Sequence, residues 1–300
     1  MVAAQGAVCV LVPHFKDEYW LSVGFGLEQE AARAGLRLSL HEAGGYEARD
    51  EQIAQIDDCR AGGAAALLIG AVSSDHPDLL AAVARAAQAM PVIGLVNELH
   101  SDALSGAVGV DWWAMGQAVG AGLAARFPAG TAPVRAAFLS GPAESGWVPL
   151  VDAGMRAALA GSAVEIVARR AADTGLRQQF AEVAGVLGGG QPLDVLIGPA
   201  PAIEAAMGYL ASHPGAARPL LVATYLSHSV RRGLADGQVA FAPFDDPIEQ
   251  GRMALRMAAA RIGGGPALGV AGPGIVLVGP EDARSSRIAL SPPGYFPHID

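Results

Sequence analysis

Cations are scarce in this sequence. Its 300 residues include 20 lysines and arginines against 29 aspartates and glutamates, which gives a net charge of −9. Affinity for nucleic acid comes from clustered cations, so this deficit argues against a nucleic-acid partner. The sequence also lacks a run of about eighteen apolar residues free of charges and helix breakers, and the nearest approach, 266–280, is interrupted by glycines and prolines. We therefore expect no direct insertion into a membrane.

Motifs of the common enzyme classes are missing as well. The sequence has no Gly-x-Ser-x-Gly elbow, no phosphate-binding Walker loop and no His-Glu-x-x-His pair. Its seven histidines show no metal-ligand spacing among themselves or with the cysteines. Gly24 and Gly26 lack the third glycine of a dinucleotide fingerprint, because Gln29 stands in its place. The sequence thus predicts a protein that is not an enzyme, holds no metal and needs no cofactor.

Only two cysteines are present, Cys9 and Cys59. A β-α-β-α-β order would place Cys9 near the start of the first strand and Cys59 near the end of the second helix, at one edge of a parallel sheet. Cysteine is often a small buried residue with a free thiol, whereas a disulfide would favour an oxidising compartment. Both possibilities stay open at this point. The start of the chain has no charged segment followed by an apolar core and cleavage site, so no leader peptide is expected in this sequence.

Short apolar segments alternate with longer helical patterns along the whole chain, an order that predicts parallel sheets with helices on both faces. Strands are expected at 7–12, 36–41, 65–70, 91–96, 106–110, 134–140, 163–168, 193–198, 219–224 and 238–243. Helices are expected at 18–34, 48–61, 77–89, 112–127, 146–160, 174–187, 200–212, 227–236 and 246–262.

The alternation divides into two sets of βα units, with the changeover near residues 104–111. A further strand and a long helix near 239–262 would return the chain to the first set. We therefore predict an α/β protein with two Rossmann-like lobes, a three-stranded hinge and a ligand cleft between the lobes. The Pro- and Gly-rich end is expected to be irregular structure near the hinge. The expected lobes are 1–107 plus 244–270 and 108–243 plus 271–300.

Aromatic residues are few, at 6% of the chain, and several stand directly after predicted strands. Ligands bind at the carboxyl ends of the strands in open α/β sheets, so these side chains are candidates for a binding site. Ordinary core packing is the alternative for each one alone, but chance would scatter them. The candidates are Tyr19 and Trp20 after the first strand, Trp112 and Trp113 after the fifth, Tyr225 after the ninth, and more weakly Trp147 after the sixth.

Polar residues beside these aromatics complete the candidate ligand set. His14 and Asp17 lie at the turn before Tyr19, and Asp111 precedes Trp112. Asp17, Asp111 and Asp173 also lie at or before predicted helix starts, where a carboxylate commonly caps the helix. We expect capping above all for Asp173, and a place at the rim of the site for His14 and Asp17.

Several segments carry a resemblance to a known family. Together with the two-lobe order and the late return crossing, they resemble the type I periplasmic binding proteins, and among these the TorT-like sensors of trimethylamine N-oxide. Sugar-binding members of the family use charged residues at three places that here hold Asn97-Glu98, Trp147-Val148 and Tyr225. The charged residues that bind sugar hydroxyls in those members are therefore absent here. The matching segments are 13–23, 42–46, 109–116, 202–206 and 225–234.

The resemblance implies a periplasmic location and a ligand cage made of Tyr19, Trp20, Trp112 and Tyr225. It also implies a small methylated amine, such as trimethylamine N-oxide, as the ligand, and the periplasmic domain of a TorS-like sensor histidine kinase as the partner. The alternative function is the solute-binding subunit of an ABC transporter, which would deliver a small sugar or polyol to its permease.

Overall fold

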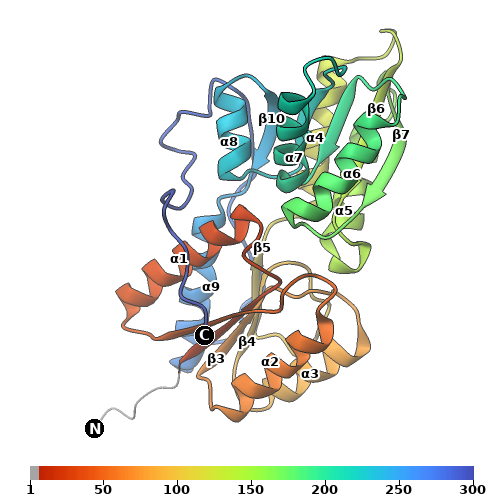
Figure 1. The fold of residues 1–300 in the computed structure, drawn as a ribbon. Coiled ribbons are helices and arrows are strands. Elements are labelled where there is room, and N and C mark those ends of the chain that lie inside the picture. The colour runs from red at the N-terminus through yellow and green to blue at the C-terminus, as the bar shows by residue number, and fades with distance from the viewer. Residues whose placement is uncertain (1–6) are drawn as a thin grey trace.

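Two six-stranded sheets form the framework of the computed structural model, which describes residues 7–300 (Figure 1). All neighbouring strands are parallel except β10 and β12, which pair antiparallel. The first sheet has the order β11 (Val270–Ala271), β5 (Gly106–Gly109), β4 (Val92–Val96), β3 (Ala66–Ile69), β1 (Val8–Val12) and β2 (Leu38–Glu42). The second has the order β12 (Val276–Val278), β10 (Val239–Phe244), β9 (Leu220–Ala223), β8 (Val195–Gly198), β6 (Val134–Ser140) and β7 (Val164–Ala171).

Helices cover each sheet and complete the two lobes (Figure 1). In the first lobe α1 packs on α9 and α2 packs on α3, while in the second lobe α4 packs on α5 and α6 on α7. The first lobe holds α1 (Glu18–Ala34), α2 (Arg49–Ala61), α3 (Pro77–Ala87) and α9 (Pro247–Ile262). The second lobe holds α4 (Trp112–Arg126), α5 (Trp147–Leu159), α6 (Leu176–Gly188), α7 (Ala200–Ser212) and α8 (His228–Ala235).

The strand β1 shows why its sequence is apolar at every position. Val8, Val10 and Val12 belong to the core cluster that contains residues of α1, whereas Cys9 and Leu11 belong to the cluster that contains residues of α2 and α3. Successive side chains of a strand point to opposite faces. A strand of a parallel sheet covered on both faces therefore reads as a continuous apolar run.

The predicted fold class is confirmed. Each expected strand and helix is present, with its ends within three residues of the expected ones. The chain passes between the sheets three times, from β5 to α4, from β10 to α9 and from β11 to β12. The strands β11 and β12 lie where irregular structure was expected, and they are only two and three residues long.

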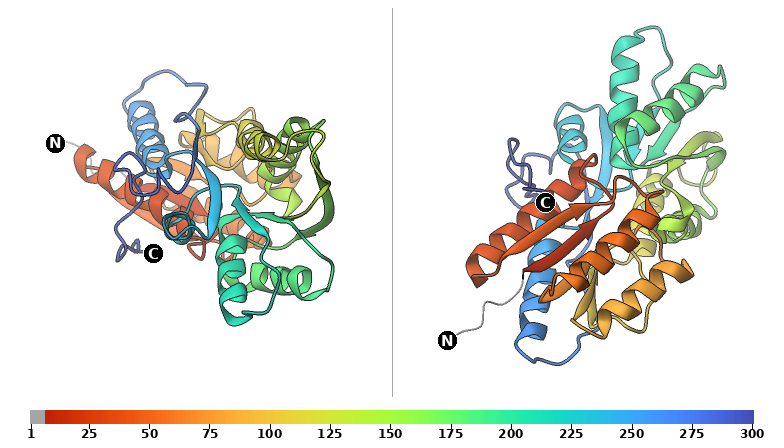
Figure 2. Two further views of the ribbon diagram at one scale, coloured as in Figure 1. Left: turned by 90° about the horizontal axis from the view of Figure 1, so that it is seen from above. Right: turned by 60° about the horizontal axis from the view of Figure 1, so that its bottom comes forward.

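The end of the chain contacts both lobes, and in the second lobe Arg231 Nε of α8 donates to Ala283 O at 2.7 Å. The backbone N–H of Ser291 donates to Ser22 Oγ in α1 at 3.1 Å, and that of Asp300 donates to Leu40 O in β2 at 2.9 Å. The C-terminus accordingly lies beside α1 (Figure 2). The expected lobe limits stay a prediction, although β5 continues to Gly109, past the boundary expected after residue 107.

The helices α4 and α5 approach each other closely at glycines. A Cβ added to Gly116 in α4 would lie 2.0 Å from Val151 O, and one added to Gly154 in α5 would lie 1.9 Å from Trp113 O. Both distances are far below contact distance, so only glycine fits at these two positions. This packing brings together the first residues of the two helices, Trp112 and Trp147.

Gly116→Ala is expected to lower the free energy of unfolding by about 2 kcal/mol, because the new methyl group forces two helix backbones apart. Gly208→Ala is the matched control, since a Cβ added at this helical position would meet no atom of the described part of the chain within 4 Å. That control should stabilise the protein by about 0.5–1 kcal/mol through helix propensity alone. Urea unfolding of both variants measures the difference. Equal effects of the two substitutions would refute the role given to the α4–α5 contact.

Candidate ligand-binding site

A small, partly open pocket lies between the two lobes, with about 250 Å³ of space that includes its solvent-facing mouth. All nine residues that line it are buried, and they come from the carboxyl ends of strands or the helix starts that follow. The first lobe supplies Asp17, Tyr19, Trp20, Tyr46, Val96 and Asn97, and the second supplies Trp112, Trp147 and Tyr225. The strand-end rule therefore located most of the cavity wall from the sequence.

Aromatic rings form a continuous chain of contacts around this cavity. The ring centroids of Trp112 and Trp147 are 5.4 Å apart, those of Trp147 and Tyr225 are 6.2 Å apart, and those of Tyr225 and Tyr19 are 5.3 Å apart. The last two pairs meet edge to face, which is a favourable arrangement for aromatic quadrupoles. The chain of rings crosses from the second lobe to the first, so the lobes share one wall.

The orientation of Trp112 is fixed by a strained turn. Its indole N–H donates to Val96 O at 3.0 Å. Val96 has a φ of 65°, in the left-handed region that a β-branched residue rarely adopts. Such strain costs about 1–3 kcal/mol and persists at functional sites where the surroundings hold it. The end of β4 thus presents its carbonyl to the ring that closes the cavity.

Asp17 is the only carboxylate among the nine described residues of the lining, and it has two functions in the fold. It caps α1 by accepting the backbone N–H of Tyr19 at 3.0 Å, and its other oxygen accepts the hydroxyl of Tyr225 from the second lobe. Burial raises the pKa of Asp17 to about 6, although both hydrogen bonds act to lower it. The apolar wall therefore carries a group that gains or loses a proton near neutral pH.

A second hydrogen-bonded pair of tyrosine and aspartate, Tyr19 and Asp245, lies next to the pair of Tyr225 and Asp17. The Tyr19 hydroxyl donates to Asp245 Oδ2 at 2.7 Å and accepts from Gln250 Nε2 at 2.9 Å. Asp245 is fully buried, and this burial raises its pKa to about 6. It follows β10 directly, at the second crossing between the lobes.

Tyr46 and Asn97 line the cavity but were not among the predicted site residues. Asn97 Nδ2 donates to the Tyr46 hydroxyl at 3.0 Å and to Ala71 O at 2.9 Å. Burial raises the pKa of Tyr46 far above its usual value, so its hydroxyl stays protonated. Both residues follow strand ends, Asn97 at once after β4 and Tyr46 a few residues after β2, so the same rule could have found them.

Three of the candidate residues do not line the cavity. His14 is fully buried one layer behind it, where Nε2 lies 3.2 Å from Asp173 Oδ1 and 3.1 Å from Thr174 Oγ1, across the lobe boundary. Asp111 is exposed and caps α4 by accepting the N–H of Ala114 at 3.0 Å. Trp113, which follows Trp112, has 39% of its surface exposed and is not part of the lining.

Asp173 was expected to cap the helix that follows it, and this expectation is wrong. The cap position of α6 is Gly175, which has no side chain to accept a hydrogen bond. Asp173 instead contacts His14 and accepts the Tyr46 N–H at 3.3 Å. Burial acts to raise the pKa of Asp173, but the His14 contact and backbone donors outweigh it and lower that pKa. The carboxylate therefore links the two lobes.

Comparison with known proteins identifies the family. A family model described as a periplasmic binding protein domain matches residues 8–266. The chain belongs to this family. Periplasmic binding proteins are two-lobed binding proteins rather than enzymes, which agrees with the fold and with the missing catalytic motifs. Within residues 7–300, the helices of this periplasmic binding protein are all too short or too polar to cross a membrane.

Its relatives include TorT. The periplasmic protein TorT of Escherichia coli K12 is 36% identical over 293 residues, which cover 97% of this chain and 83% of the relative. The TorT chain in a crystal structure of the TorS sensor domain–TorT complex without ligand is 35% identical, with a TM-score of 0.86 over 98% of this chain and 100% of that one. The same complex in the presence of trimethylamine N-oxide gives a TM-score of 0.85 at 35% identity, over 99% of this chain and 100% of that one.

A transport protein is similar to nearly the same extent. An ABC transporter solute binding protein from Bradyrhizobium sp. BTAi1, with bound Bis-Tris, is 33% identical with a TM-score of 0.80. The match covers 99% of this chain and 90% of that one. The chain is therefore similar both to a protein that binds a sensor domain and to a protein of an ABC transporter. Sequence and structural similarity alone do not choose between these two roles.

Proposed function

We propose that this protein binds trimethylamine N-oxide or a similarly small methylated amine in the periplasm and reports it to a membrane histidine kinase. The observation that carries the proposal is the aromatic cavity between the lobes, which has a single carboxylate among its nine lining residues. The proposed cage consists of Tyr19, Trp20, Trp112 and Tyr225, completed by Trp147, with Asp17 as its polar group. His14 and Asp111 are left outside this cage.

Methylated nitrogen suits such a wall. A trimethylated nitrogen has no N–H to donate and presents methyl groups with a diffuse positive charge. Aromatic faces attract such groups by cation–π contact, worth about 0.5–2 kcal/mol each. The oxide oxygen requires a hydrogen-bond donor. Asp17 can supply one when it is protonated, and its ionised form instead attracts a ligand with net positive charge.

The size of the ligand limits the affinity. Trimethylamine N-oxide has five heavy atoms, and the best small ligands reach about −1.5 kcal/mol per heavy atom. The ceiling is therefore about −7.5 kcal/mol, which corresponds to a dissociation constant in the micromolar range. We expect a sensor of micromolar or weaker ligand rather than a scavenger.

A transport role is the second candidate, and the Bradyrhizobium relative favours it. Bis-Tris, which that protein holds, is a tertiary amine with several hydroxyl groups. A sugar or polyol would need polar partners, and few are free in this cavity. Asn97 already binds Tyr46 and Ala71, and Tyr225 already binds Asp17. This pairing favours an amine over a sugar in either role.

Calorimetric titration with trimethylamine N-oxide, choline and ribose tests the ligand class. We expect saturable binding of the N-oxide with a micromolar or weaker constant, and no binding of ribose. Saturation by ribose without any response to the N-oxide would refute the proposed ligand class.

Sedimentation with the periplasmic domain of the TorS-like kinase from the same genome tests the partner. A stable complex is expected. If no complex forms and the loaded protein instead stimulates a purified ABC permease, the signalling role is refuted and the transport role takes its place.

A further inference from the structure

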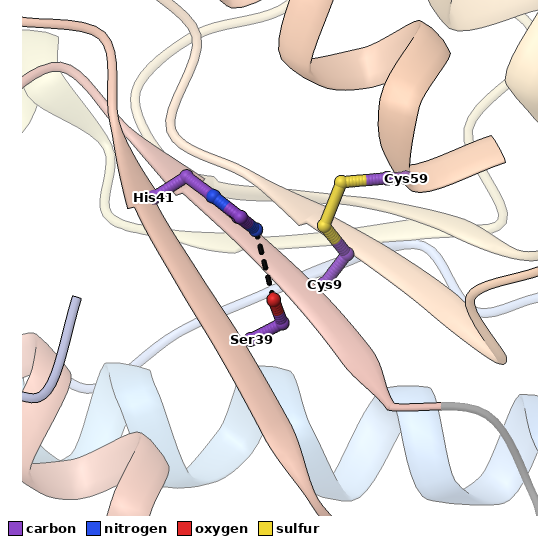
Figure 3. The surroundings of a disulfide bond; sticks show 4 residues. All are labelled: Cys9, Ser39, His41 and Cys59. Carbon is purple, nitrogen blue, oxygen red and sulfur yellow. Dashed lines mark hydrogen bonds between the residues drawn. A yellow bond between two sulfur atoms is a disulfide. The ribbon is translucent and has the colours of Figure 1, made fainter. Parts of the chain in front are cut away.

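Two cysteines and a histidine, which are residue types that can bind metals, meet between the first sheet and α2, away from the ligand cavity. A disulfide joins Cys9 in β1 to Cys59 in α2, with their Cα atoms 6.1 Å apart, and His41 of β2 lies beside it (Figure 3). The structure thus takes the disulfide alternative for the two cysteines. We call these three residues the Cys9–Cys59–His41 cluster. None of them lines the cavity between the lobes.

The sheet register places this cluster. Cys9 pairs with Ser39 and Leu11 pairs with His41 in the parallel ladder of β1 and β2. Alternate residues of a strand share a face, so Cys9, Ser39 and His41 point to the side that α2 covers. Because β2 is the edge strand of the sheet, His41 is only partly buried.

The geometry of the cluster fits a metal ion. One sulfur from each cysteine and one ring nitrogen of His41 all lie within 4.8 Å of one another. The Ser39 hydroxyl lies 2.9 Å from His41 Nε2 and orients the ring (Figure 3). An open cavity with an empty volume of about 600 Å³ adjoins the cluster, and Gln55 and Asp58 share in its lining. A cation could enter there and keep a water as its fourth ligand.

We propose that the Cys9–Cys59–His41 cluster is a binding site for a soft divalent cation of the zinc type when its disulfide is reduced. A dithiol supplies the two electrons and two protons, is itself oxidised to a disulfide, and leaves Cys9 and Cys59 as thiols. The cation then displaces both thiol protons to solvent and takes two thiolates and the imidazole as ligands. A small-molecule disulfide reverses the step: it accepts the two electrons and takes up two protons to become two thiols, the Cys9–Cys59 bond forms again, and the cation is released.

The donor set decides the class of cation. Two thiolates and one imidazole with an open fourth position are a typical tetrahedral zinc set, whereas calcium and magnesium require oxygen ligands. A structural disulfide needs no histidine beside it, and the adjoining cavity, which Gln55 and Asp58 help to line, adds nothing to its stability. The hydroxyl that holds the imidazole corresponds to the outer-shell partners that orient metal-bound histidines.

Cobalt(II) tests the proposal, because it replaces zinc and is coloured. The full chain is reduced with dithiothreitol, freed of it by gel filtration under nitrogen, and titrated with Co²⁺ alone. We expect one equivalent to bind, with thiolate-to-cobalt charge-transfer absorption and the visible bands of tetrahedral cobalt. The air-oxidised protein should show neither signal. Circular dichroism before and after reduction monitors the fold.

Variants separate the three ligands. Cys59→Ser should lose most of the charge-transfer absorption. His41→Ala should weaken Co²⁺ binding at least tenfold, since loss of an outer-shell partner alone costs about 10–100-fold. His298→Ala is the control, because its imidazole is 91% exposed near the C-terminus, and it should bind like the wild type. The proposal fails if the reduced wild type shows no cobalt bands, or if His41→Ala binds Co²⁺ as tightly as the wild type.

Discussion

Trp112→Ala should weaken the binding of trimethylamine N-oxide by more than a hundredfold. A desolvated cation–π contact is worth about 2 kcal/mol, and the lost apolar contact area adds roughly 1 kcal/mol. The sum of about 3 kcal/mol corresponds to a change of roughly 150-fold in the dissociation constant. Trp112 also supports Trp147, whose ring lies 5.4 Å away, so its removal loosens a second wall of the cavity. Isothermal titration calorimetry measures the change.

The neighbouring residue supplies the control for this experiment. Trp113 has the same side chain on the same helix, but it lies outside the cavity and is 39% exposed. Trp113→Ala should therefore leave the affinity within about twofold of the wild type, as for a surface substitution away from the site. Trp112→Phe keeps an aromatic face but loses the indole N–H bond to Val96, and should fall between the two. Equal losses in Trp112→Ala and Trp113→Ala would refute the assignment of Trp112 to the cage.

The fold and one part of the site could be predicted because they depend on local patterns. The apolar runs of β1 and β3, both buried on two faces, identify strands of a covered parallel sheet. Tyr19, Trp112 and Tyr225 could be predicted because strand ends in such sheets meet at the ligand edge. These inferences needed only the order of strands and helices along the chain and the residue types at the strand ends.

The remainder of the site depends on contacts between distant segments. Asp245 reaches Tyr19 from 226 residues along the chain, and Asp173 reaches His14 from 159 residues away. No local pattern distinguishes such carboxylates from ordinary helix caps, which is why Asp173 was assigned wrongly. Likewise β11 and β12 are too short to show a period, and they form only because the edges of β5 and β10 are there to pair with them.

Two buried carboxylates should make the protein less stable as the pH rises from about 4 to about 6. The pKa values of Asp17 and Asp245 are raised from 3.8 to about 6, mainly by burial. Between these values the folded chain holds protons that the unfolded chain has released, so unfolding becomes easier with rising pH. Each group contributes at most roughly 3 kcal/mol to this loss. Asp173, with its lowered pKa, acts in the opposite sense.

A variant isolates the effect of one carboxylate from the rest of the titration. Asp245→Asn keeps an oxygen to accept the Tyr19 hydroxyl, and its amide nitrogen can occupy the place of Oδ1, which has no hydrogen-bond partner within residues 7–300. The amide side chain of this variant carries no charge at any pH. The free energy of unfolding of the variant should therefore rise relative to that of the wild type, by up to roughly 3 kcal/mol between pH 4 and pH 7.5. Urea unfolding at a series of pH values measures this gain. Asp17→Asn should gain in the same direction, because burial raises the pKa of Asp17 as well. A difference between Asp245→Asn and the wild type that stays constant with pH would show that Asp245 does not hold its proton in the folded protein.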